Sequence, residues 1–232
     1  MLKRDVLFHI LRLARDSSEF SLDDLSRVAK IPSVETRKQV GALLDSGMLM
    51  LEHEIVSLDA EKRLRIAHEA LNQGADLEKV CRLLSWQEFE EITTRSLEAN
   101  GFSTFKHFVF MLNRRRREID VIGIAHVLVV CLDCKHWMKG IRGRIGEEIV
   151  SRQIERVQSL ATHESSLDRL RIGVGNDLYL VPAIVSLVDA GPRFIRHVPV
   201  VPVLKLNSFL SSIDPFVDGL FTIKVKRTRE LK

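Results

Sequence analysis

The chain has 232 residues, of which 45% are hydrophobic and 28% are charged, the balance of a protein with a packed core and a polar surface. No stretch reaches 18 apolar residues, and the first residues lack the apolar segment of a signal peptide, so neither a membrane span nor secretion is expected. Three cysteines do not make a disulfide framework. These features predict a cytoplasmic protein without membrane contacts.

The formal charge of +4 is unevenly distributed along the chain. Residues 1–84 carry 13 Lys and Arg against 14 Asp and Glu, whereas residues 85–232 carry 22 against 17. The net charge is therefore −1 in the first part and +5 in the second. A basic second part favours a polyanionic partner there.

Residues 1–60 predict a small, mostly helical domain. Apolar residues recur at helical spacing in three segments, and Ser21 and Ser33 are the expected N-caps of the second and third helix. Two short apolar runs then flank Glu52-His53-Glu54, which indicates a hairpin. Three helices followed by a hairpin resemble a winged helix.

In a winged helix the third helix enters the major groove of DNA. Its exposed cations here are Arg37 and Lys38, which are candidate DNA contacts. Glu35 on the same helix and the acidic hairpin tip oppose a strongly DNA-binding surface. Contact with a protein partner is therefore the alternative use of this domain.

Residues 61–84 have a charged, helical pattern and are predicted to connect this domain to a second one. Ser85 is a natural N-cap, so the second domain is expected to cover residues 85–232. Its pattern reads helix, three strands, helix, two strands and helix. That order predicts an α/β fold with a mixed sheet flanked by helices.

Residues 118–137 are the centre of the second domain and predict a β-hairpin with strands that are apolar on both faces. A turn at Ala125-His126 sets Asp120 opposite Cys131. Asp120 and Asp133 are then diagonal neighbours, about 7–8 Å apart at the backbone. Two carboxylates at that spacing can reach one cation between them.

Lys135 shares a strand face with Asp133 and Asp120. Burying unpaired charge is costly, so acids at the end of a buried hairpin are expected to be paired, bound to a metal ion or solvated in a cleft. The plain alternative is a charged strand end that emerges into water.

Two polar residues interrupt apolar helix stripes that are expected to face the sheet. Glu90 lies on the stripe of the helix over 86–99, and Gln153 lies on that of the helix over 147–161. A site near the hairpin would explain both. The alternatives are a glutamate at the stripe edge that reaches water and an amide that packs with a main-chain hydrogen bond.

Two basic segments flank the hairpin. A charge run is by default a solvated face, but beside paired carboxylates it suggests a surface that holds a phosphate backbone while the acids hold a cation. The second segment is rich in glycine yet matches neither a P-loop nor a dinucleotide-binding motif. The candidate DNA contacts are Arg114, Arg115, Arg116, Arg117, Lys139, Arg142 and Arg144.

Cys131 and Cys134 have the CxxC spacing of many zinc and redox sites. Residues three apart on a strand point to opposite faces of a sheet. We therefore expect neither a zinc site nor a redox pair here.

The ordered set of Glu90, Asp120, Asp133-Cys-Lys135 and Gln153 resembles the PD-(D/E)XK nuclease superfamily. The similarity is greatest to its Mrr-type restriction endonuclease and archaeal Holliday-junction-resolvase branches, and it covers about residues 85–205. Ile119 stands where the motif name has proline, and Asp133 stands where many members have glutamate. Both changes keep the carboxylates.

The resemblance implies a restriction-endonuclease-like fold and an Mg²⁺-dependent endonuclease that hydrolyses DNA in repair, recombination or restriction, with Mn²⁺ as a substitute. Lys135 would orient or activate the attacking water, and Gln153 would support the site or contact DNA. The ligands implied for the metal ion are Asp120, Asp133, the Cys134 carbonyl and Glu90.

Two other functions are compatible with the sequence. One is a non-catalytic DNA-binding or regulatory protein on a nuclease-like fold, and the other is an adaptor whose winged helix recruits a repair partner. The intact set of Asp120, Asp133 and Lys135 favours the enzyme, since a regulator does not need it. A homodimer would suit the cutting of two strands.

Overall fold

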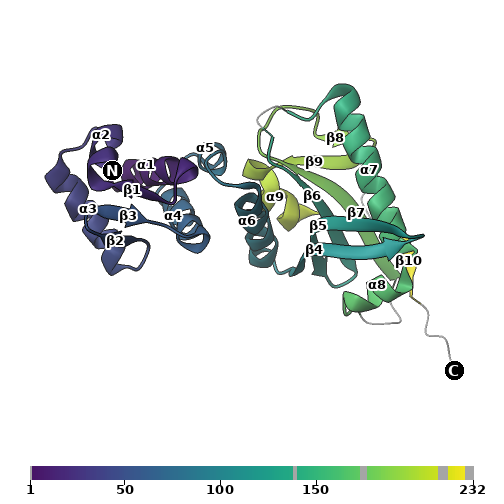
Figure 1. Ribbon diagram of the computed structural model, residues 1–232. Coiled ribbons are helices and arrows are strands. Elements are labelled where there is room, and N and C mark those ends of the chain that lie inside the picture. Colours follow the sequence, from purple (N-terminus) through teal and green to yellow (C-terminus); the bar gives the residue numbers. More distant parts are fainter. Residues whose placement is uncertain (1, 138–139, 173–176, 214–218, 228–232) are drawn as a thin grey trace. The chain divides into compact units, whose positions relative to one another are not determined.

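The computed structural model describes residues 2–137, 140–172, 177–213 and 219–227. The chain divides into two compact units, Met1–Glu88 and Phe89–Lys232, each with its own buried apolar residues (Figure 1). None of the helices in these residues is long and apolar enough to cross a lipid bilayer.

The first unit combines helices with a three-stranded antiparallel sheet in the order β1-β3-β2. The predicted three helices and hairpin are present, and the two hairpin loop residues, His53 and Glu54, have left-handed φ values of 48° and 69°. The elements are α1 (Leu2–Asp16), β1 (Glu19–Ser21), α2 (Leu22–Ala29), α3 (Ser33–Asp45), β2 (Met50–Glu52) and β3 (Ile55–Ser57).

The predicted cap of α2 is confirmed, whereas that of α3 is wrong. The Ser21 hydroxyl accepts the Asp24 main-chain N–H at 3.0 Å, and the Asp24 carboxylate accepts the Ser21 N–H in return. Helix α3 begins at Ser33 itself, after Pro32, whose side chain makes no cap. Proline already holds the backbone angle that starts a helix, and its carbonyl accepts the Thr36 N–H at 3.0 Å.

Residues 61–84 contain most of α4 (Ala60–Asn72) and all of α5 (Leu77–Cys81), and both helices belong to the first unit because α4 packs along α1. Arg63 of α4 donates to the Glu88 carboxylate at 2.8 Å, and that carboxylate also accepts the Ser85 main-chain N–H at 2.6 Å. The Ser85 hydroxyl accepts the Glu88 N–H, so Ser85 caps the following helix as predicted. Pairing compensates for the burial of both charges.

The second unit is a mixed sheet with helices on both faces, which confirms the predicted α/β class. The strand order is β4-β5-β6-β7-β9-β8, with β10 also paired to β7. The β4–β5–β6 meander is antiparallel, and β6, β7 and β9 are parallel. The elements are α6 (Trp86–Ala99), β4 (Ser103–Leu112), β5 (Arg115–Ala125), β6 (Leu128–Lys135), α7 (Gly143–Ala161), α8 (Glu164–Arg169), β7 (Asp177–Ser186), β8 (Phe194–Ile195), β9 (Val198–Pro202), a 3-10 turn (Val203–Lys205), α9 (Leu206–Ser212) and β10 (Ile223–Lys226).

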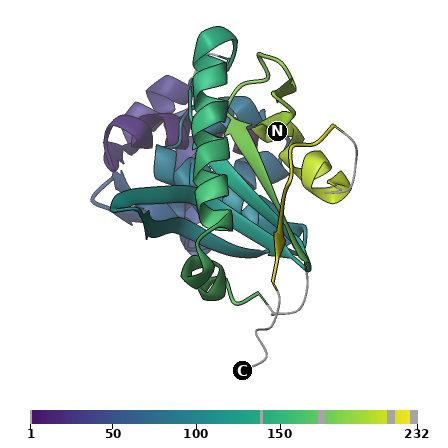
Figure 2. The same ribbon diagram turned by 90° about the vertical axis from the view of Figure 1, so that its right-hand side faces the viewer.

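Helix α7 lies across one face of this sheet, and α6 and α9 lie on the other (Figures 1 and 2). The buried side chains of α7 include Val150, Ile154, Val157 and Leu160, which recur every three or four residues and form one stripe. On the opposite face, Leu97 of α6 covers a glycine of β5. The strand region between these helices is therefore dry on both sides.

The predicted register of the β5–β6 hairpin is wrong. Cys131 pairs with Ile122 rather than with Asp120, and the loop is His126-Val127 rather than Ala125-His126. His126 adopts a left-handed φ of 53°, a conformation that histidine enters more readily than most residues. Each β6 residue pairs with a β5 residue two positions further along than predicted. Because the shift is an even number of residues, each side chain keeps its predicted face of the sheet.

The position of Gly123 in β5 is expected to have no room for a side chain. A Cβ there would lie 2.5 Å from Cδ2 of the buried Leu97. We predict that Gly123→Ala destabilises the second unit by about 1–3 kcal/mol through overpacking. Calorimetric melting checks this.

Gly41→Ala on α3 is the matched control for this substitution. Its added Cβ meets nothing within 4 Å, and its effect is expected to be neutral or stabilising because alanine favours helix. A Gly123→Ala protein that melts like the wild type would show that Leu97 does not close this face of the sheet.

Candidate active site

The sheet divides between β5 and β6 at the end of their pairing. The last paired residues are Val121 and Leu132. Beyond them β5 stays with β4, whereas β6 stays with β7 through Lys135. We call this point, where β5 and β6 separate beyond Val121 and Leu132, the fork. Asp120 and Asp133 are the first residues past it on their strands, so the two predicted carboxylates come together there.

The Asp120 carboxylate fills the position that a strand partner would occupy. Its Oδ2 accepts the Cys134 main-chain N–H at 2.8 Å. The carboxyl is 8% exposed. Burial raises its pKa, the charge of Asp133 raises it further, and the Cys134 amide counteracts both.

Asp133 is 2% exposed and carries two cationic partners. Lys135 Nζ lies 2.7 Å from its Oδ2, and Arg156 Nη1 of α7 lies 2.7 Å from its Oδ1. Lys135 was predicted at this site and Arg156 was not. The charge of a buried carboxylate is thus neutralised from the same strand and from the neighbouring helix.

Gln153 holds this arrangement to the sheet. It is fully buried, its Nε2 donates to the Cys131 carbonyl at 2.8 Å, and its Oε1 accepts from Arg156 at 3.2 Å. The alternative of an amide with a main-chain hydrogen bond is therefore realised, and the same amide also positions the arginine that contacts Asp133. Arg156 follows Gln153 by three residues, so helical spacing alone could have found it.

Glu90 points into the second unit from α6 and is 2% exposed, which rules out the stripe-edge alternative. Neither carboxylate oxygen has a hydrogen-bond partner within the described residues. Burial raises the Glu90 pKa to about 7, and the charge of Asp120 adds to this, whereas His107 lowers it. A buried acid without a hydrogen bond is expensive, which marks this position as one with a use beyond packing.

The sequence analysis did not predict His107 as a residue of this site, and no local sequence pattern indicates it. It sits in the middle of β4 with a left-handed φ of 49°, between the paired residues Lys106 and Phe108. Its Nε2 lies 3.4 Å from Glu90 Oε2, and its Nδ1 lies 3.5 Å from Glu118 Oε1.

The strands are irregular around His107. Phe105 and Phe108 are three residues apart yet pack into one apolar cluster, as do Ile119 and Ile122 on β5. Such backbone strain is typical of functional positions.

The donors at the fork suit a hard cation such as Mg²⁺. Among the described residues no three His, Cys, Asp or Glu side chains form a ready-made metal site. Mg²⁺ needs less, because it binds through one or two carboxylates and keeps several waters. The Cys134 N–H faces Asp120, and the carbonyl of a strand residue points to the same side as its N–H, so the Cys134 carbonyl is a further oxygen donor on that side of β6.

The arginine run forms the tip of the β4–β5 hairpin. Asn113 and Arg114 are the two loop residues, both with left-handed φ, and Arg115 is exposed. Arg116 pairs with Glu118, and Arg117 pairs with Glu155 of α7 at 2.6 Å.

The remaining candidate DNA contacts are dispersed. Arg142 and Arg144 are exposed at the start of α7, which begins four residues earlier than expected, and Lys139 lies outside the described residues. Arg37 pairs with Glu54 at 2.5 Å, and Lys38 is exposed; both belong to the first unit.

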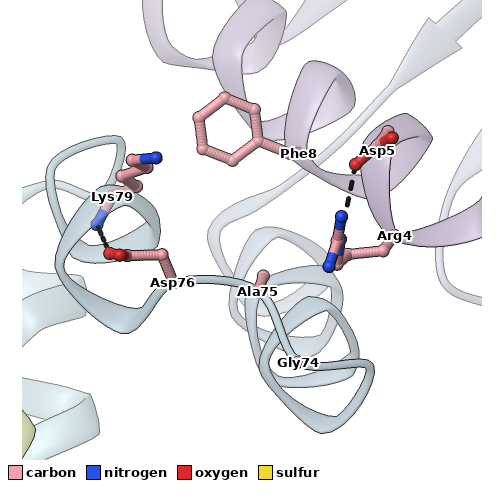
Figure 3. A pocket seen from close by; sticks show the side chains of 7 residues that line it. All are labelled: Arg4, Asp5, Phe8, Gly74, Ala75, Asp76 and Lys79. Carbon is pink, nitrogen blue, oxygen red and sulfur yellow. Dashed lines mark hydrogen bonds and ion pairs between the residues drawn. The ribbon is translucent and has the colours of Figure 1, made fainter.

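A separate hollow of about 300 Å³ lies in the first unit between α1 and the α4–α5 connection (Figure 3). Its lining carries two cations, Arg4 and Lys79, and two acids, of which Asp5 pairs with Arg4 and Asp76 caps α5 by accepting the Lys79 N–H. None of the predicted site residues lines it.

No protein-family model matches the chain. An uncharacterized protein of Archaeoglobus fulgidus is 32% identical over 130 residues, which are 56% of this chain and 92% of that protein. The chain belongs to the family of this archaeal protein. Because that relative is described only as uncharacterized, the family assigns no activity to the fork.

Two crystal structures are similar in part. The protein of unknown function AF1548 has a TM-score of 0.30 at 17% identity over 44% of this chain and 47% of that one. Protein VC1899 from Vibrio cholerae has a TM-score of 0.37 at 15% identity over 91% and 50%. The chain thus spans about half of each, and neither similarity supports an argument.

Glu90 is predicted to make the second unit less stable as the pH rises. Its pKa of about 7 in the folded protein lies above the ordinary 4.5, so the folded state binds the extra proton between these values. Stability is full below about pH 4.5 and falls through pH 7 by roughly 1–3 kcal/mol.

Unfolding measured in EDTA across this pH range tests the effect. Glu90→Gln should flatten the profile, whereas Glu98→Gln, on the same helix and exposed, should not. Wild-type and Glu90→Gln profiles with the same slope would contradict the assignment.

Proposed function

We propose that this protein is a metal-dependent DNA endonuclease with a restriction-endonuclease-like catalytic unit of the PD-(D/E)XK type. The observation that carries the proposal is the fork between β5 and β6, where buried Asp120 and Asp133 meet the partly buried Lys135. Two acids and a lysine in this arrangement match the motif that the sequence resembles. A surface with a net charge of +5 on the same part of the chain suits a phosphate backbone.

The ligands for Mg²⁺ are Asp120, Asp133 and the Cys134 carbonyl, with Glu90 as an additional ligand of the ion or of its water. When bound, the ion lowers the pKa of a coordinated water and offsets the charge that builds on the phosphate. The oxygens of these residues match the ligand preference of Mg²⁺, with Mn²⁺ as a substitute.

The other residues act around these ligands. Lys135 lies 2.7 Å from Asp133, so its ammonium group can hold the attacking water beside the scissile phosphate and stabilise the developing negative charge. Gln153 keeps the β6 main chain and Arg156 in place. Placement on two strands and a helix keeps this geometry rigid.

DNA is the proposed partner of both units. Hairpin-tip and α7 cations hold the phosphate backbone near the fork, and the winged-helix-like first unit offers Arg37 and Lys38. The Arg37–Glu54 pair leaves less free charge there, which keeps a protein partner as the alternative use of this unit. A homodimer would place two forks on the two strands of a duplex.

A regulatory, non-catalytic DNA-binding protein is the second candidate function. It is favoured by the two cations on Asp133, because a carboxylate neutralised by its own chain is also a plain structural ion pair. The Glu90 carboxylate argues against it, because it is buried without a hydrogen bond among the described residues and has only the His107 ring beside it at 3.4 Å.

Wild-type protein is expected to cut labelled DNA only when Mg²⁺ or Mn²⁺ is present. We predict that Asp133→Asn lowers the rate by about 100-fold or more, the size of a single catalytic group's contribution. Asp189→Asn, an exposed acid that pairs with Lys205, is the matched control and should cut normally. Tight binding without cutting of duplex, single-stranded and four-way-junction DNA would favour the regulatory function instead.

Arg156 and a divalent ion are expected to compete for Asp133 Oδ1. We predict that Arg156→Gln raises the affinity for Mn²⁺ by about tenfold, because a charge-assisted hydrogen bond no longer has to be released. Free Mn²⁺ measured by electron paramagnetic resonance reports the affinity without any reaction. Arg152→Gln, an exposed arginine one turn earlier on α7, should leave it unchanged; equal affinity in both variants would place the ion away from Asp133.

A further inference from the structure

A cleft of about 460 Å³ lies between β4 and the end of α8, on the outer side of the sheet. It is lined by Phe105, Lys106, His107, Phe108, Asp168, Arg169 and Arg171. Strand β4 is at the end of the strand order, so no further strand blocks the approach to it. Its volume is in the range of sites that hold small molecules or single nucleotides.

The cleft carries uncompensated positive charge. Lys106 pairs with Glu91 at 2.7 Å, and Asp168 pairs with Arg227, so these two residues of the lining are neutralised. Arg169 and Arg171 make no ion pair within the part of the chain that the structure describes. Two guanidinium groups without an acidic partner among these residues are suited to a phosphate, which they can hold through charge-assisted hydrogen bonds.

The flat surface that the cleft offers to an aromatic ring is the exposed Arg169 guanidinium, because the Phe108 ring beneath it is buried. The Arg169 guanidinium lies 4.5 Å above the Phe108 ring and is held there by a hydrogen bond of 2.8 Å to the Val109 carbonyl. Phe105, half-buried, stands edge-on to Phe108 at 6.2 Å. Guanidinium planes and phenyl rings are the groups on which nucleic-acid-binding proteins stack unpaired bases.

His107 connects the cleft to the fork. It lines the cleft, and its Nε2 lies 3.4 Å from the carboxylate of Glu90. The left-handed backbone at His107 is what turns the ring from the strand toward that acid. A nucleotide in the cleft is therefore next to a residue that contacts one of the proposed catalytic carboxylates.

We propose that this cleft binds an unpaired nucleotide of a DNA strand next to the cleavage site. This inference rests on the proposed nuclease function. It narrows the expected substrate to DNA with a single-stranded flank, gap or branch. A base inside a duplex is stacked on both faces and cannot reach the Arg169–Phe108 surface or Phe105. Unpaired bases offer that face, and their phosphates meet Arg169 and Arg171.

Fluorescence anisotropy tests the proposal with three labelled DNAs: a blunt duplex, the same duplex with a single-stranded tail, and the tail alone. Binding is measured in Ca²⁺ and in EDTA, and cleavage is measured separately in Mg²⁺. We expect wild type to bind the tailed duplex about tenfold more tightly than the blunt one, the size of one base stacked on an aromatic group. Arg169→Ala/Arg171→Ala is expected to remove this preference.

Two further variants distinguish binding in the cleft from a general effect of lost positive charge and from an effect of misfolding. Arg193→Ala/Lys205→Ala removes the same charge near β8 and β9, toward the other end of the strand order, and should keep the preference. Phe105→Leu keeps the apolar packing but removes a ring, and should weaken only the binding of tailed and single-stranded DNA. Melting temperatures check that each variant folds.

The outcomes distinguish the inference from the proposed function. Equal binding of blunt and tailed DNA by wild type, or the same preference in Arg169→Ala/Arg171→Ala, overturns the cleft even if DNA is cut. A preference that depends on these arginines supports the cleft even when no DNA is cut, in which case the nuclease proposal fails alone. DNA that does not bind in any form overturns both.

Discussion

The separation of β5 from β6 is the constraint on which the second unit depends. A sheet interior requires every main-chain N–H and carbonyl to find a partner, and the fork removes the partner strand where helices cover both faces. Asp120 resolves this by accepting the Cys134 N–H, so a carboxylate does the work of a neighbouring strand. The acid is thus part of the architecture as well as of the site.

A buried acid at the fork then requires positive charge nearby. Lys135 and Arg156 provide it for Asp133, and Gln153 connects Arg156 to the β6 main chain. Each group in this set satisfies another, so the interior stays polar without unpaired charge on the α7 side. Glu90 on the α6 side is the exception, since its carboxylate has no hydrogen-bond partner within the described residues. The two sides of the fork therefore differ in how their buried charge is compensated.

The same irregularity shapes the outer edge of the sheet. At His107 the alternation of side chains slips, and residues three apart enter one core cluster. The histidine ring lies 3.4 Å from Glu90, while Phe105 and Phe108 belong to the core cluster and also line the cleft beside α8. Strain at one residue therefore serves both the acidic fork and the surface that borders it.

Much of this protein follows from its sequence. Apolar periodicity and length predicted the mixed α/β unit and its helix, meander and helix order, and the polar interruptions at Glu90 and Gln153 predicted buried side chains that face the sheet. Short elements such as β1, α8 and β8 were missed because two to six residues carry too little periodicity. The hairpin register was misjudged because a histidine can replace the glycine or asparagine that usually marks such a turn.

The sequence by itself determined which polar motif residues lie around the fork, since acid, acid-x-lysine and glutamine in this order are visible without coordinates. The tertiary structure alone decided which partners they have. The contact of Arg156 with Asp133 joins a helix to a strand 23 residues away in the chain, and His107 of β4 meets Glu90 of α6 and Glu118 of β5. Local patterns specify side-chain faces and helical spacing, whereas contacts between distant segments exist only once the whole sheet has been assembled and its fork has opened.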